Sequence, residues 1–158
     1  LNRDKARYEE QTTVRELEPD LTDAEAERYF LAGDAALEAG NFTTALTNYT
    51  RVVTDGGDSE YVPLALYKAA RIYAISGEAD LALPLFEMIV NDYPVPETYD
   101  GALKSMSDIH AAAGQFGEAV ASLDRMVFID QELFNPEDIA EDREELVREA
   151  ERAEGGAE

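Results

Sequence analysis

Apolar residues recur along most of the chain at intervals of three, four and seven, the pattern of helices that bury one face. Glycines interrupt this pattern at a constant distance, because Gly40, Gly77 and Gly114 lie 37 residues apart. Glycine readily adopts the left-handed backbone conformation that ends a helix. The pattern therefore predicts an all-α chain in which pairs of helices are joined by glycine turns.

The segments after the three glycines share one pattern, which indicates an internal repeat. Each has alanine at its fifth position, a large apolar residue four positions later and an apolar pair at its end. They read NFTTALTNYTRVV, EADLALPLFEMIV and QFGEAVASLDRMV. A fixed period of this size is typical of proteins built from stacked helical hairpins. We therefore predict three consecutive helix-turn-helix repeats.

Helix-end signals divide the chain into segments. Thr22 with Glu25 forms a capping box before the first repeat, and Asn135 with Pro136 starts a final helix. Pro84 falls inside a predicted helix and is expected to bend it. The final helix has a narrow apolar stripe, which suits a cap on the last repeat. The expected segments are a polar extension with a weak helix (1–21), three repeats (22–57, 58–95 and 96–134), a capping helix (135–153) and a disordered tail (154–158).

The order of small, aromatic, glycine and alanine positions resembles the tetratricopeptide repeat. The second repeat carries the match most fully, through Leu66, Ala69, Ala70, Tyr73, Gly77, Ala82, Phe86 and Pro94. The third departs furthest, with His110 where the family has a tyrosine. The resemblance implies a right-handed α-solenoid of three repeats plus a C-terminal capping helix, with a concave groove lined by the first helix of each repeat.

The residues that the helix register assigns to this groove include Phe30, Asp34, Tyr67, Arg71, Lys104 and Asp108, which we take as the candidate binding residues. Phe30 and Tyr67 occupy equivalent positions and would offer aromatic area to a bound peptide. Alternatively, the N-terminal segment covers Phe30, and the charges only solvate the groove. Some family members grip a C-terminal carboxylate with basic and amide side chains, but only one matching position here is basic. Those positions hold Phe30, Asp34, Lys68, Gly101 and Ser105.

The chain carries 35 acidic and 13 basic side chains, which give a formal net charge of −22. Such a charge repels nucleic acid and anionic membrane surfaces, and it attracts a basic partner. The acidity also suits solubility in a salt-rich setting, or loose binding of divalent cations. No apolar run approaches the roughly 20 residues of a membrane-spanning helix, so direct membrane insertion is not expected.

The sequence does not determine the cellular compartment of the protein. The repeats are longer than the family's usual length of about 34 residues, and such stretched repeats resemble those of bacterial envelope proteins. This resemblance favours a periplasmic or envelope-associated location over a cytoplasmic one, whereas the absence of cysteine suits both. Because the chain begins at Leu1 rather than at a methionine, we expect that it has been trimmed.

Chemistry for catalysis or metal binding is scarce. Cysteine is absent, and His110 is the single histidine, with no serine or second histidine placed to form a nucleophile pair with it. His110 falls where the family packs an aromatic ring, so we expect it to pack between helices. The acidic stretch at residues 55–60, DGGDSE, lacks the alternating oxygen ligands of an EF-hand loop. We therefore expect no enzyme, no cofactor and no bound metal.

The sequence thus predicts a non-catalytic scaffold that binds a peptide or protein segment in its groove, with a basic segment as the partner that the charge would attract. The alternative is a structural or oligomerisation module of a larger assembly, with the groove filled by the chain's own terminal segment. The oligomeric state stays open.

Overall fold

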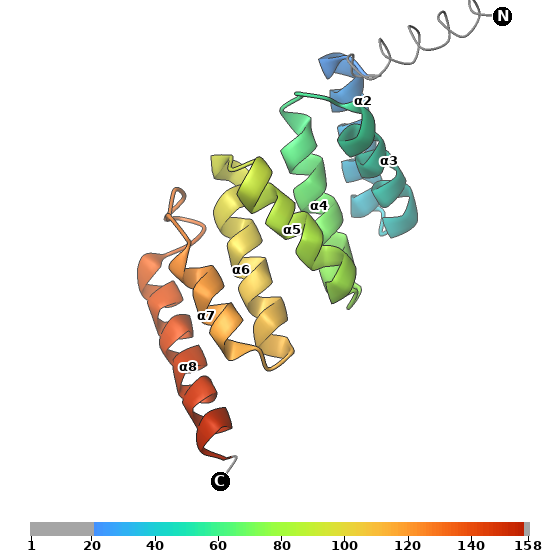
Figure 1. Cartoon of the computed structure of the whole chain (residues 1–158). Helices are drawn as coiled ribbons and strands as arrows, with labels where there is room; N and C mark the ends of the chain where they lie inside the picture. The colour runs from blue at the N-terminus through green and yellow to red at the C-terminus, as the bar shows by residue number, and fades with distance from the viewer. Residues whose placement is uncertain (1–20, 157–158) are drawn as a thin grey trace, which may run out of the picture. The chain divides into compact units, whose positions relative to one another are not determined.

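The computed structural model describes residues 21–156, and this part of the chain consists of seven helices without a strand (Figure 1). The predicted all-α class is confirmed for it. The weak helix predicted within residues 1–21 falls on residues outside the described part, except for Leu21. The chain divides into two compact units, residues 1–66 and 67–158, which are described separately below.

The first unit contains α2 (Asp23–Glu38), α3 (Phe42–Asp55) and the beginning of α4 (Tyr61–Ile75). The predicted capping box at the start of α2 is confirmed: the backbone N–H of Thr22 donates to Glu25 Oε2 at 2.9 Å, and that of Glu25 donates to Thr22 Oγ1 at 3.4 Å. α2 packs along α3. Their contact depends on Gly33 of α2, which lies against the buried ring of Tyr49 of α3.

The second unit contains the rest of α4 together with α5 (Ala79–Asp92), α6 (Pro96–Ala112), α7 (Phe116–Asp124) and α8 (Pro136–Gly155). From α5 onwards, each helix packs against the next one in the sequence (Figure 1). Phe86, Ile89 and Leu103 are fully buried in this unit. α8 begins as predicted, with Asn135 as its N-cap and Pro136 in its first turn.

The three glycine turns have the conformation that the sequence predicts. Gly40, Gly77 and Gly114 have φ angles of 72°, 78° and 73°. These values lie in the left-handed region, which side chains with a Cβ rarely adopt. Each glycine follows the end of one helix and precedes the next, so the predicted alternation of helix, glycine turn and helix is confirmed.

The third hairpin differs from the repeat pattern. α3 and α5 each have 14 residues, but α7 has only nine and ends at Asp124. Met126 is buried as the pattern predicts, whereas Val127 is exposed. After Asp124 the N–H groups of Arg125 and Met126 donate to carbonyls three residues earlier, and the N–H of Val127 donates to the buried carboxylate of Asp100 on α6.

The end of α8 also differs from its predicted position. The sequence predicts a helix over 135–153 and a disordered tail over 154–158, but Glu154 and Gly155 are helical. The added turn is closed by Gly156, whose N–H donates to the carbonyl of Arg152 at 3.0 Å. Arg152 also forms an ion pair with Glu149 near this end. Residues 157–158 lie outside the described part.

The contact at Gly33 gives a direct test of the packing in the first unit. A Cβ added to Gly33 would lie 2.5 Å from Cε1 of the Tyr49 ring, closer than side chains tolerate. We expect Gly33→Ala to lower the free energy of unfolding by about 1–3 kcal/mol, measured by urea denaturation. Gly117→Ala is the control, because a Cβ there meets nothing within 4 Å. Equal stability of the two variants would contradict this packing.

Candidate functional site

Phe30 belongs to the core of the first unit. Its side chain is 8% exposed, and its ring centroid lies 5.8 Å from that of Tyr49 and 5.4 Å from that of Tyr61. The sequence predicts an open aromatic surface at Phe30 or, alternatively, one covered by the N-terminal segment. In the structure two tyrosines of the unit's own helices contact the ring, so little of it is left for a partner.

Asp34 takes part in the same core. The Tyr49 hydroxyl donates a hydrogen bond to Asp34 Oδ1 at 2.5 Å. Burial and then this hydrogen bond raise the pKa of Tyr49 above its ordinary value. The Asp34 carboxylate therefore joins α2 to α3.

Tyr67 and Arg71 lie together on the part of α4 that belongs to the second unit. The Arg71 guanidinium is 5.8 Å from the centroid of the Tyr67 ring, within the range of a cation–π contact. The ring packs edge-on against Phe86, with centroids 6.1 Å apart. Burial raises the pKa of the Tyr67 hydroxyl, and Arg71 opposes this shift. Arg71 itself is exposed to solvent, whereas the Tyr67 ring packs against the buried Phe86.

Tyr67 also contacts α6, at Gly101. A Cβ added to Gly101 would lie 2.4 Å from the Tyr67 hydroxyl oxygen. The hydroxyl therefore rests on the backbone of α6 at a position where only glycine leaves room. Ser105, one turn further along α6, donates its hydroxyl hydrogen bond to the carbonyl of Gly101 at 2.8 Å. Tyr67 thus connects the surface of α4 to that of α6.

Lys104 and Asp108 form an ion pair on the next part of α6. Lys104 Nζ lies 2.6 Å from Asp108 Oδ1 and 3.6 Å from Oδ2 of Asp142 on α8. The two residues of α6 are one helical turn apart, the spacing at which side chains on one helix meet. Lys104 therefore links α6 to α8.

A cavity of about 210 Å³ lies beside this ion pair and is lined by α6, α7 and α8. Its lining residues are Lys104, Ser107, Asp108, Ala111, Leu123, Asp142, Glu145 and Leu146. Three of them are acidic and one is basic, and Lys104 already contacts two of the three carboxylates. Alanine and leucine side chains supply its apolar lining. The cavity is suited to a ligand that combines a positive charge with apolar groups.

α8 is held against α7 by an ion pair outside this cavity. Arg143 Nε lies 2.6 Å from Asp124 Oδ1, and Nη2 lies 3.3 Å from Oδ2, so the contact is bidentate. The hydrogen bond from Arg143 lowers the pKa of Asp124. This pair positions the helix that carries Asp142, Glu145 and Leu146.

Of the six predicted groove residues, the structure pairs Tyr67 with Arg71 and Lys104 with Asp108. Phe30 and Asp34 lie in the first unit, each with partners there. Leu146 belongs to the apolar stripe predicted for α8, but the sequence did not single out Asp142 and Glu145, because α8 is interpreted from sequence only as a cap. Their spacing on one helix face is the signal that would have identified them.

The remaining candidate chemistry is limited. His110 Nδ1 lies 2.8 Å from Gln115 Oε1, a contact across the glycine turn between α6 and α7. Within residues 21–156, no three histidine, cysteine, aspartate or glutamate residues gather as a metal site would require. No helix in the same range has both the length and the apolar character to cross a membrane.

Comparison with models of protein families gives no match to the chain, and comparison with curated proteins gives no significant match either.

The ion pair between Asp124 and Arg143 predicts a dependence of stability on pH. A carboxylate with a lowered pKa stabilises the fold above its unfolded pKa, and this contribution is lost as the pH falls through the folded pKa. We expect Asp124→Asn to lower the midpoint of urea unfolding modestly at pH 7, because both partners are largely exposed. The difference from wild type should shrink as the pH falls below the ordinary aspartate pKa, and it should disappear once the pH is below the lowered pKa of Asp124.

Glu141→Gln, at an exposed acid of α8, is the control for the loss of one negative charge. A difference between wild type and Asp124→Asn that persists unchanged into acid would contradict the assignment of the lowered pKa to this pair.

Proposed function

We propose that the chain is a non-catalytic binding scaffold of the tetratricopeptide type, in which the hairpins stack as a right-handed α-solenoid and hold a segment of a partner protein. Three hairpins with the same left-handed glycine turn and a 37-residue period support this proposal. The location proposed with it is the bacterial envelope or periplasm, on the resemblance of the stretched repeats.

The observation that carries the proposal is the cavity between α6 and α8. Its apolar lining would hold an aliphatic side chain, and its carboxylates would receive a lysine or arginine beside it. Asp142 and Glu145 lie on successive turns of α8, so a basic group between them would meet two carboxylates at once. A segment with neighbouring apolar and basic residues is therefore the expected partner.

Tyr67 and Arg71 extend this binding surface along the same unit. The Tyr67 hydroxyl lies on α6 at Gly101, three residues before Lys104. The exposed guanidinium of Arg71 is available to backbone carbonyls of a bound segment. A cation that already stacks on a tyrosine loses little conformational freedom on binding, which favours affinity.

Removal of the cavity's negative charge tests the proposal. Random peptides displayed on phage are selected on the wild-type protein, and the enriched peptides are titrated by calorimetry. We expect enrichment in lysine and arginine beside leucine-like residues. Asp142→Asn with Glu145→Gln should then weaken binding about ten-fold, since both carboxylates line the cavity and would pair with the cation of the bound segment. Affinity should also fall steeply with added salt.

Glu141→Gln with Glu151→Gln is the matched control, because both acids are exposed on α8 and neither lines the cavity. Selection of acidic peptides, or equal loss of affinity in the control and cavity variants, would refute the proposal.

A further inference from the structure

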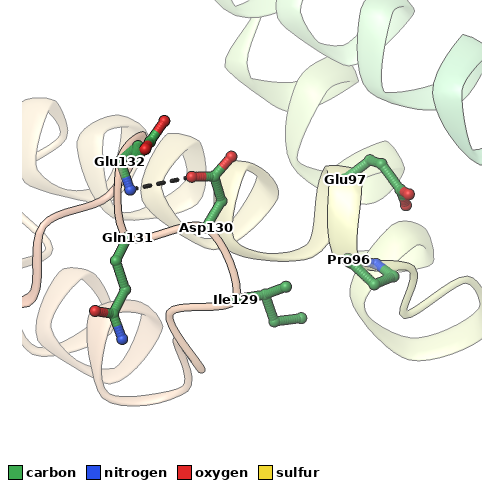
Figure 2. A pocket seen from close by; sticks show the side chains of 6 residues that line it. All are labelled: Pro96, Glu97, Ile129, Asp130, Gln131 and Glu132. Atoms are coloured by element: carbon green, nitrogen blue, oxygen red, sulfur yellow. Dashed lines mark hydrogen bonds between the residues drawn. The ribbon is translucent and has the colours of Figure 1, made fainter.

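A second surface lies at the other end of α6, where residues 125–135 connect α7 to α8. Figure 2 shows a hollow at this place, between the start of α6 and the connecting segment. Its volume is about 520 Å³, and it is lined by Pro96, Glu97, Ile129, Asp130, Gln131 and Glu132. Glu97 and Lys104 are seven residues apart on α6, which places the hollow about 10 Å along the helix from the cavity beside Lys104.

Large apolar side chains gather in the connecting segment. Val127 is 56% exposed, Ile129 52% and Leu133 66%. Single exposed apolar residues are ordinary on protein surfaces, whereas a group of them marks a place of contact. Val127, Ile129 and Leu133 lie within seven residues of one another in the sequence, and Ile129 lines the hollow (Figure 2).

The backbone holds these side chains in place. Asp100, which is 2% exposed, accepts the N–H groups of Val127 and Ile129 at 2.8 and 3.0 Å. Between them Phe128 has a φ of 54°, which is rare for a bulky side chain. Asp130 Oδ1 accepts the N–H groups of Glu132 and Leu133, both at 3.1 Å. The exposed position of the apolar side chains is thus fixed by hydrogen bonds to the chain that carries them.

The charge around the hollow selects the kind of ligand. Glu97, Asp130 and Glu132 place three carboxylates at its edge, and none of its lining residues is basic. An acidic segment would be repelled there, and a purely apolar one would leave the carboxylates without a counter-charge. A segment with both apolar and basic side chains complements the whole surface.

We propose that this hollow is a second docking site, for a partner segment in which an aliphatic side chain is flanked by lysine or arginine. The aliphatic group would lie against Pro96 and Ile129, and the cationic groups would pair with Glu97 and Glu132. The site is separate from the cavity between α6 and α8, so its existence does not depend on the function proposed above. A partner that contacts both sites would gain affinity from their connection through one helix.

The test uses a fluorescein-labelled peptide of alternating leucine and lysine as the probe, with its leucine–glutamate counterpart as the charge control. Fluorescence anisotropy measures binding to the full chain. It is repeated in the Asp142→Asn, Glu145→Gln background, in which binding at the cavity is expected to be weakened. We expect the lysine probe to bind in that background and the glutamate peptide not to bind.

Two variants then locate the binding. We expect Ile129→Ser, and separately Glu97→Gln with Glu132→Gln, to weaken probe binding about five-fold or more. Asp100→Asn, which removes the charge that fixes the segment, should also weaken binding without altering a side chain in the hollow. Ile75→Ser is the matched control, because Ile75 is 66% exposed on α4 and does not line the hollow.

Equal probe affinity in Ile129→Ser and in Ile75→Ser would overturn the proposal. Equal binding of the glutamate peptide would overturn its charge assignment. Analytical ultracentrifugation gives a third result. If the wild type self-associates and does not bind the probe, and Ile129→Ser is monomeric, the occupant is a second copy of this chain and the proposed partner is wrong.

Discussion

The described structure depends first on the sharp glycine turn that brings two successive helices together. A helix of 14 to 17 residues with one apolar face is not stable alone in water, and it must bury that face against a neighbour. Gly40, Gly77 and Gly114 make this neighbour available, because each one ends a helix in the left-handed conformation and allows the following helix to run back along it. The equal spacing of these glycines gives the chain its repeated hairpins.

Close helix contact then determines which surfaces remain for a partner. In the first unit, the absence of a side chain at Gly33 leaves room for the ring of Tyr49, and the Tyr49 hydroxyl donates a hydrogen bond to Asp34. In the second unit, the absence of a side chain at Gly101 leaves room for the Tyr67 hydroxyl, but the exposed guanidinium of Arg71 lies over the Tyr67 ring. A glycine–tyrosine contact between helices therefore occurs in both units, but the predicted binding residues are enclosed in the first unit and partly exposed in the second.

Much of the fold follows from local rules that a sequence reveals. The left-handed turns, the capping box at Thr22 and the start of the last helix at Asn135 each depend on residues close in the chain. The features that the sequence did not reveal depend on distant pairs. Asp100 holds the segment after α7 by accepting backbone N–H groups 27 and 29 residues later in the chain, and no local pattern records that contact.

The candidate site shows the same division. Helix register predicted that Tyr67, Arg71, Lys104 and Asp108 lie on a binding surface. In the structure Tyr67 contacts Arg71 on α4, and Lys104 contacts Asp108 on α6. Register could not show that Phe30 is enclosed by two tyrosines, because Tyr61 comes from a third helix. It also could not show that α8 completes the cavity with Asp142, since that requires α8 to pack beside α7 and close to Lys104.

The central claim is that α6 and α8 of the second unit together hold a basic segment of a partner. Hydrogen–deuterium exchange of the full chain, measured with and without a peptide selected for binding, tests it most directly. The account predicts slower exchange in α6 around residues 104–111 and in α8 around residues 142–146, with exchange in α2 and α3 unchanged. Protection confined to α2 and α3, or absent from α8, would contradict it.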